Sequence, residues 1–419
     1  MSTASPWQAW FVAAAVFFLF FVFAPVRTRD GRSFQIDEAH KISETHFLRL
    51  FVRGDFHSRE WFRNIVDRTN PPVGKYILGS AIVLHRLPLP PSPSLAIEAA
   101  DGRIPAAFPR AVNARYARYL APARRATLLA TALTAALLVW SAMRLHSMLA
   151  AAGALFFFTL HHLTLGFGAI AIFDPLVALM GMAIVPPVWI LWRGQGGIRR
   201  WIAAIAAGVI CGLAIGIRFN GGVCLLFAAA VTLIAGARHR SRSTLVAGVI
   251  VVLTAVVVVV ALNPYFWAAA PVGQGVAEEF SRNEALPLRV VNRFSYQLRD
   301  LSLLIAGLDG ALMHSLTRRS GFFGLTMFGD VPGFLLWIGV SLGILLPLLR
   351  RRVSDDLRFV WLWAAVVGGV TALWLPVAWQ RYLMVALPPL ALLGGIGLAE
   401  IVAAIRNYRR PAAALRSAA

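Results

Sequence analysis

The sequence predicts an all-α integral membrane protein with about ten transmembrane helices, and two observations carry this prediction. Hydrophobic residues make up 58% of the 419 residues, and the mean hydropathy is +0.69. Apolar runs of about 18 residues or more recur along the chain, and each can cross roughly 30 Å of hydrocarbon. Because backbone polar groups in lipid must be satisfied within their own segment, these runs are expected to be helices. A soluble domain is excluded.

The expected spans follow one another along a single polytopic membrane domain, residues 1–419, and are separated by short basic links or by long loops. The first run lacks a charged segment before it and a small-residue cleavage site before Arg27, so we expect a retained helix rather than a signal peptide. The spans are residues 7–26, 124–143, 147–167, 175–193, 201–217, 221–237, 244–262, 332–350, 357–376 and 381–404.

A shorter apolar run, residues 72–85, decides the predicted sidedness. At about 1.5 Å per residue it reaches only about 20 Å. If it does not cross and the N-terminus is cytoplasmic, the arginine-rich short links fall inside, as the positive-inside rule requires. These links are residues 193–200, 238–242 and 350–358, together with a short cytoplasmic tail, residues 406–419. We therefore expect ten crossings, with residues 72–85 forming a helix in the outer interface.

Two long loops, residues 27–123 and 263–331, then lie on the outer side. Long loops are translocated largely regardless of charge, so their arginines do not contradict this orientation. The net charge is +21, and only two of the 40 Lys and Arg residues are lysines. Such arginine use is typical of a GC-rich bacterial genome, so we expect a bacterial inner (plasma) membrane with the loops on the periplasmic or extracellular side. Nucleic-acid binding is not expected, because the arginines are scattered over helix ends.

The first outer loop is the most polar part of the chain and carries its own helical patterns. Apolar residues recur at helical spacing from Asp37 to Val52, and Gly54 is placed to end that helix. Ser58 can cap a second short helix over residues 59–66. These patterns predict amphipathic helices that lie along the membrane surface.

Polar residues from separate parts of the chain fall on this outer side, which indicates a functional site. The adjacent carboxylates Asp37 and Glu38 closely follow the first span. A carboxylate there can accept a proton from a hydroxyl that attacks the anomeric carbon of a sugar. Acids at a helix start also suit the helix macrodipole, and this plainer interpretation stays open.

Two further charged positions have both a functional and an ordinary interpretation. Lys75 follows Asn-Pro-Pro-Val-Gly, where its compact ammonium is suited to binding phosphate as a point charge. A lysine in an interfacial helix also snorkels to the membrane surface. Asp174 opens a span, and an acid at a membrane boundary is a functional candidate, although Asp-Pro is also a common helix start.

The remaining candidates lie at three boundaries of expected spans. Arg218 interrupts an apolar stretch, where an ordinary turn would serve equally. Asn263 precedes a proline and marks at least the end of a span. Arg381 and Tyr382 open the last span, which places a guanidinium at the outer interface. That guanidinium can bind a substrate phosphate or snorkel to lipid headgroups.

Histidine spacing does not predict a metal site. His40 and His46 lie six positions apart, and the adjacent pair His161 and His162 cannot easily present both rings to one ion. A divalent ion held by Asp37, Asp174 and a histidine stays an alternative, and no cofactor is assigned.

These residues give the chain a resemblance to the C-type (GT-C) membrane glycosyltransferases. It is most similar to the family of protein O-mannosyltransferases and lipid A aminoarabinose transferases, which use a phospholipid carrier. The matching motifs are Asp37-Glu38 for the acidic pair, Thr69-Asn-Pro-Pro-Val-Gly-Lys75 for His-Pro-Pro-Leu-Gly-Lys, Asp174-Pro, Asn263-Pro, and Arg381-Tyr382 with Pro388-Pro389. Asn70 stands where the family has histidine, and the soluble module of some eukaryotic members is missing. These departures leave the acceptor open.

The resemblance implies an inverting transferase that moves a sugar from a polyprenyl-phosphate-linked donor to a hydroxyl of a protein, lipid or glycan. By that analogy Asp37 is the general base, Glu38 assists acceptor binding or geometry, and Lys75 and Arg381 bind phosphate. The rest of the implied substrate-binding set is Asp174, Arg218, Asn263 and Tyr382. The alternative is a multi-pass transporter or a flippase for lipid-linked sugars, which should show internal repeats with paired broken helices. We find no such repeat in the sequence.

Overall fold

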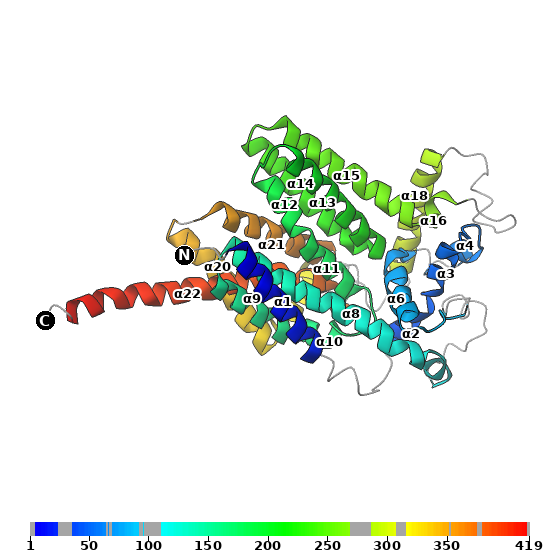
Figure 1. Ribbon diagram of the computed structural model, residues 1–419, viewed down its shortest axis with the longest axis horizontal. Helices are drawn as coiled ribbons and strands as arrows, with labels where there is room; N and C mark the ends of the chain where they lie inside the picture. Colours follow the sequence, from blue (N-terminus) through cyan, green and yellow to red (C-terminus); the bar gives the residue numbers. More distant parts are fainter. Residues whose placement is uncertain are drawn as a thin grey trace.

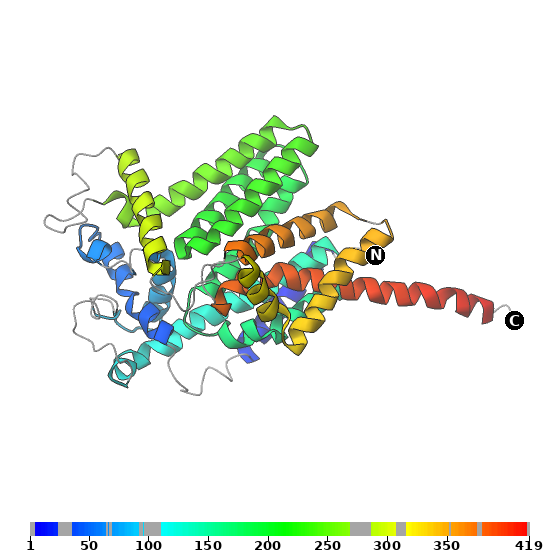
Figure 2. The same ribbon diagram turned by 180° about the vertical axis from the view of Figure 1, so that it is seen from behind.

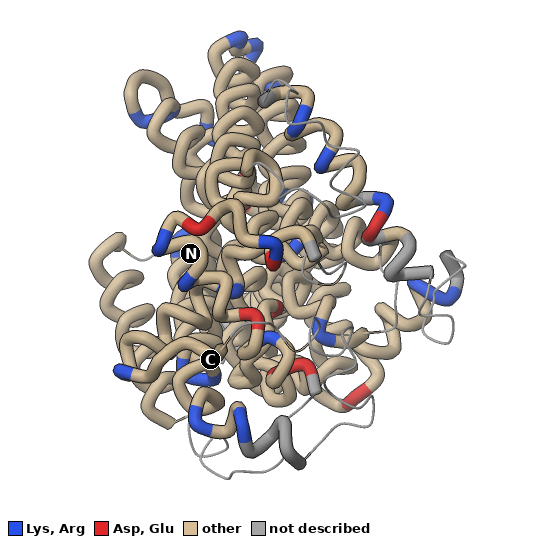
Figure 3. Tube along the Cα trace, turned by 90° about the vertical axis from the view of Figure 1, so that its right-hand side faces the viewer, with Lys and Arg blue, Asp and Glu red and all other residues tan. Residues whose placement is uncertain are grey.

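The computed structural model describes residues 5–23, 36–63, 66, 69–91, 95, 110–268, 286–306, 316–351, 353–374 and 379–416. All regular elements in these ranges are helices, which confirms the predicted all-α class. Figure 3 shows that most of the chain is uncharged, with basic residues gathered at the ends and turns of helices. That distribution suits helices embedded in hydrocarbon, where a charged side chain is costly.

Nine segments are long and apolar enough to cross a membrane within the described ranges. They lie in α1 (Pro6–Phe23), α8 (Arg110–Leu145), α11 (Asp174–Ala183) with α12 (Val185–Trp192), α13 (Ile198–Ile217), η2 (Phe219–Gly221) with α14 (Gly222–Arg238), α15 (Arg242–Leu262), α20 (Val331–Leu349), α21 (Asp355–Trp374) and α22 (Leu387–Arg416).

The third expected span, residues 147–167, is not among these nine segments because it is broken. It consists of α9 (Met148–Leu160) and α10 (His162–Phe167), and the extended backbone of His161 (ψ 136°) ends the first helix. With 13 residues α9 is about 20 Å long, shorter than the roughly 30 Å hydrocarbon layer. It is nonetheless well packed, against α8 and α22.

Small residues allow α20 and α22 to approach closely, as is common between membrane helices. A Cβ atom added to Gly397 would lie 2.0 Å from the carbonyl oxygen of Gly339, so neither position has room for a side chain. This contact fixes the last span in the bundle. η4 (Gln380–Val385), which carries two of the predicted site residues, directly precedes that span.

Short helices gather at one end of the molecule, which we call the loop end (Figures 1 and 2). The start of α1 and the end of α22 both lie toward the opposite end (Figure 1). One further helix, α19 (Leu316–Phe328), directly precedes α20 in the chain. The loop end contains α2 (Ile36–Ser43), α3 (His46–Val52), α4 (Glu60–Arg63), α6 (Val73–Leu84), α16 (Pro264–Trp267) and α18 (Leu286–Ala306).

The first loop is more deeply packed than its amphipathic pattern predicted. Residues 37–52 form two helices, because a turn at Glu44 and Thr45 separates α2 from α3. Gly54 (φ 70°) follows the end of α3, as expected. Seven of the twelve residues of α6 are buried, and α6 packs against α2, α3, α8 and α13 rather than resting on the surface. α8 begins at Arg110, within the residues expected to form the first loop.

Candidate active site

Asp37 and Glu38 are adjacent at the start of α2 but occupy different environments. Glu38 is fully buried. Its carboxylate accepts two hydrogen bonds from Arg124 (2.8 and 2.7 Å) and one from the backbone N–H of Ala171 (2.9 Å). Glu38 therefore ties α2 to α8 and to the segment before α11. Of the two roles expected for it, this geometry fits positioning rather than contact with an acceptor.

Asp37 faces the other way and keeps 41% of its side-chain surface exposed. A guanidinium nitrogen (Nη1) of Arg381 contacts its Oδ2 atom. The two residues are 344 positions apart in the chain, so only the fold brings α2 and η4 together. The exposed part of the Asp37 carboxylate can meet a substrate, and its paired oxygen faces a cation.

Asp174, Arg218 and Tyr382 form a second set of contacts beside this pair. Nη1 of Arg218 donates to both carboxylate oxygens of Asp174 (2.8 and 2.7 Å), and its Nη2 donates to the hydroxyl of Tyr382 (2.6 Å). The same guanidinium lies 4.1 Å from the centre of the Tyr382 ring. Nε of Arg381 lies 3.8 Å from Asp174. The structure thus joins five predicted residues: four of alternating charge, Asp37–Arg381–Asp174–Arg218, and Tyr382, whose hydroxyl ends the chain.

Lys75, another of the predicted phosphate-binding residues, is almost fully buried. Its Nζ atom lies 3.7 Å from Glu44 and 4.3 Å from the centre of the Phe47 ring. The glycine before it is required for packing, since a Cβ atom on Gly74 would lie 2.8 Å from the ring of Phe173. Phe173 precedes Asp174, so the Pro-Pro-Val-Gly-Lys motif packs directly against the segment that presents Asp174.

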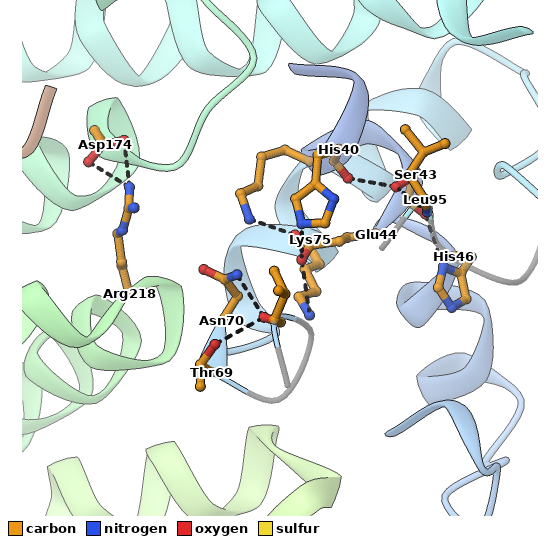
Figure 4. A network of polar contacts seen from close by, with 12 residues as sticks. His40, Ser43, Glu44, His46, Thr69, Asn70, Lys75, Leu95, Asp174 and Arg218 are labelled. Atoms are coloured by element: carbon orange, nitrogen blue, oxygen red, sulfur yellow. Dashed lines mark hydrogen bonds and ion pairs between the residues drawn. The ribbon is translucent and has the colours of Figure 1, made fainter. Parts of the chain in front are cut away.

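Glu44 and Lys41 were not among the predicted site residues, yet both lie beside Lys75. Figure 4 shows Glu44 between His40 and Lys75, near the pair formed by Asp174 and Arg218. Nζ of Lys41 donates to Glu44 (3.0 Å), and His40 lies 3.2 Å from it. Burial by itself raises the pKa of Glu44, but Lys41, Lys75 and His40 outweigh it and hold that pKa well below its usual value. The three-residue spacing of Lys41 and Glu44, which suits an ion pair on one face of a helix, was the sequence signal that could have identified them.

Asn263 has a local role in the structure. Its side chain accepts a hydrogen bond from the backbone N–H of Tyr265 (3.2 Å) and caps α16. The carbonyl of the preceding residue, Leu262, accepts a hydrogen bond from Tyr76 (3.2 Å), which links this corner to α6. Asn263 thus positions the end of α15 near the site, with no contact to the alternating charges within the described ranges.

The residues considered for metal binding are held by other partners. Asp37 and Asp174 each face an arginine. Within the described ranges, ligand atoms of His161, His162 and Asp330 lie within 4.8 Å of one another, closer than the sequence suggested. However, Nδ1 of His161 accepts a hydrogen bond from Leu163, and its Nε2 bonds to the carbonyl of Met327 (3.0 Å). These bonds use both ring nitrogens to hold α10 against the end of α19.

An apolar cavity of about 690 Å³ opens beside the charged network. Val, Leu, Ile and Phe side chains from α13, α14, α15 and α18 form most of its wall. Tyr382 lies in the wall and also bonds to Arg218, so the cavity adjoins the charges directly. A long apolar group in this cavity would place an attached anion at the arginines.

The fold is that of a helical integral membrane protein, with paired acids and arginines at the loop end. Comparison with family models and with curated proteins gives no match. Among solved structures, the chain is similar to ArnT from Cupriavidus metallidurans bound to undecaprenyl phosphate (TM-score 0.53, 16% identity, 92% of this chain and 58% of that chain). The apo state of that protein gives a TM-score of 0.52 at 15% identity, with 93% and 58% covered.

This chain therefore spans a little more than half the length of the ArnT chain it matches. At such low identity the likeness shows a shared fold. It confirms the resemblance in fold to the C-type membrane glycosyltransferases that the sequence motifs predicted.

Proposed function

We propose that the protein is an inverting glycosyltransferase that moves a sugar from a polyprenyl-phosphate donor to a hydroxyl acceptor. The observation that carries this proposal is the alternating chain from Asp37 to Tyr382, placed beside an apolar cavity. It combines a half-exposed carboxylate with two guanidinium groups. A base for a hydroxyl and cations for a leaving phosphate are what such a transfer requires.

The donor is assigned from chemistry and from the likeness in fold. Arginine binds phosphate through paired N–H donors, and Arg218 and Arg381 supply them beside Tyr382. The cavity accommodates the start of a prenyl chain, with its phosphate at those arginines. ArnT, which shares the fold, has been solved bound to undecaprenyl phosphate. A polyprenyl phosphate therefore suits both the apolar cavity and the two arginines beside it.

The reaction follows as a single displacement. The acceptor oxygen forms a bond to the anomeric carbon while the bond from that carbon to the phosphate oxygen breaks. The hydroxyl proton passes to Asp37, and polyprenyl phosphate leaves with the electron pair. The arginines stabilise the negative charge that develops on the leaving phosphate, which is usually a large catalytic contribution. Attack from the face opposite the phosphate inverts the anomeric centre.

The loop end is assigned to the periplasmic or extracellular side of a bacterial inner membrane. Basic links gather at the other end, where Arg193 pairs with Asp356 (2.6 Å) and Arg238 pairs with Asp355. Short arginine-rich links favour the cytoplasm. The site then faces the outer leaflet, from which it can take a lipid-linked donor.

The test is sugar transfer by purified protein in vesicles, using a panel of radiolabelled undecaprenyl-phosphate sugars and peptide, lipid and glycan acceptors. Wild type should release label from the lipid, and Asp37→Asn should not, although it folds and inserts normally. Asp55→Asn, which removes an exposed carboxylate of the same loop, should behave as wild type. Movement of labelled lipid across the vesicle without release would instead support the transporter alternative.

A further inference from the structure

The two lysines of the chain meet at a single carboxylate. Nζ of Lys41 lies 3.0 Å from Oε2 of Glu44, and Nζ of Lys75 lies 3.7 Å from Oε1. All other basic positions among the 40 Lys and Arg residues are arginines. Glu44 is fully buried, and only 9% of the Lys41 side chain is exposed. A chain that uses arginine elsewhere has placed both of its compact ammonium groups at this one point.

Lys41 also lies against the segment that carries the phosphate-binding candidates. Its Nζ atom is 4.9 Å from the centre of the Phe173 ring, and Phe173 is adjacent to Asp174. Burial lowers the pKa of Lys41, Glu44 opposes that effect, and the positive charges of Arg218 and Lys75 lower it again. Lys41 thus lies within the electrostatic reach of both Glu44 and Arg218.

One ion pair does not use the full binding capacity of this lysine. An ammonium has three N–H donors, and in the described part of the chain Glu44 is the only side chain that accepts one from Lys41. Glu44 and Asp174 offset part of the repulsion among the buried cations Lys41, Lys75 and Arg218. An anion between Lys41 and Arg218 would relieve that repulsion and fill the remaining donors.

We propose that Lys41 is a further binding residue for the donor phosphate, and that Glu44 is the positioning residue that holds it beside Phe173. This inference rests on the proposed function and extends its phosphate site from η4 and α13 to α2. The ammonium acts as a point charge that needs less space than a guanidinium. The space between Glu44 and the Phe173 ring is suited to that compact group.

The test measures binding of undecaprenyl phosphate to the full-length protein in detergent, with undecaprenol and inorganic phosphate as comparison ligands. Lys41→Met should weaken binding of undecaprenyl phosphate roughly ten- to a hundredfold, the effect of losing a hydrogen bond to a charged group. Undecaprenol binding should not change. Arg53→Met, which removes an exposed charge after α3, should leave both unchanged. Weakened inorganic phosphate binding without an effect on the lipid would overturn the assignment to the donor.

A second variant separates binding from folding, because Lys41→Met leaves Glu44 with one fewer partner. The double variant Lys41→Met/Glu44→Gln removes the pair as a unit, and thermal unfolding measured beside wild type checks that it is folded at the assay temperature. If Lys41 binds the donor, the double variant still binds undecaprenyl phosphate weakly. Wild-type affinity in the double variant would show that Lys41 only neutralises Glu44. If wild type itself bound no undecaprenyl phosphate, the proposed function would fail together with this inference.

Discussion

Asp37→Asn should tighten the binding of undecaprenyl phosphate even though it abolishes transfer. In the structure Arg381 contacts Asp37, and its Nε atom has no hydrogen-bond partner in the described ranges. Asp174, its other neighbour, already receives two hydrogen bonds from Arg218. A phosphate that recruits Arg381 must therefore compete with Asp37. Weakening this contact increases the fraction of protein that is ready to bind.

The size of the effect follows from the exposure of the pair. The side chains of Asp37 and Arg381 are 41% and 13% exposed, so solvent screens the attraction. Pairs that solvent reaches are worth up to about 1 kcal/mol. Because 1.4 kcal/mol corresponds to a tenfold change, the variant should bind undecaprenyl phosphate up to about fivefold more tightly than wild type.

The assay is equilibrium binding of undecaprenyl phosphate in detergent, with the same change made in an Arg381→Gln background. Loss of a negative charge from the site would by itself favour an anion in both backgrounds. Competition for Arg381 adds to this effect, so the gain should be larger where Arg381 is present. Equal gains in both backgrounds, or weaker binding by Asp37→Asn, would refute the reasoning.

Two further predictions concern the supports of the site. Gly74→Ala places a methyl group 2.8 Å from the Phe173 ring, so it should lower the stability by about 1–3 kcal/mol and reduce transfer. Gly166→Ala is the control, because Gly166 has open space around it, and it should change neither quantity. Thermal unfolding and transfer assays measure the two effects. Glu44 has a depressed pKa, so its stabilising contribution is present above its usual pKa of 4.5 and is lost as the pH falls below it. In thermal unfolding measured against pH, wild type should therefore be more stable than Glu44→Gln above about pH 4.5 and lose this extra stability below it. A difference in stability that does not change with pH would contradict the assigned role of Glu44.

The sequence was sufficient for the fold class because hydrocarbon imposes a simple rule on composition and segment length. It also identified five residues that the structure joins, since charges at the ends of spans are costly and therefore informative. The break at His161 was not predictable in this way. It depends on a hydrogen bond to the carbonyl of Met327, 166 positions away, which no local apolar pattern encodes.

The separate environments of the acidic pair were also beyond the sequence. Adjacent carboxylates at a helix start point in different directions, and Glu38 is buried against the distant partners Arg124 and Ala171. The burial of Lys41 and Glu44 was likewise not predictable, because their spacing fits an ordinary surface ion pair. They are buried because α2 packs against α6 and α8, whereas the sequence pattern predicted a helix on the membrane surface.

The most direct test of the central claim is the turnover of a labelled undecaprenyl-phosphate sugar by wild type and Asp37→Asn in sealed vesicles. Wild type should transfer the sugar and leave free undecaprenyl phosphate, while Asp37→Asn should bind the donor and leave it intact. Near-normal turnover by Asp37→Asn would contradict the assignment of this carboxylate as the base.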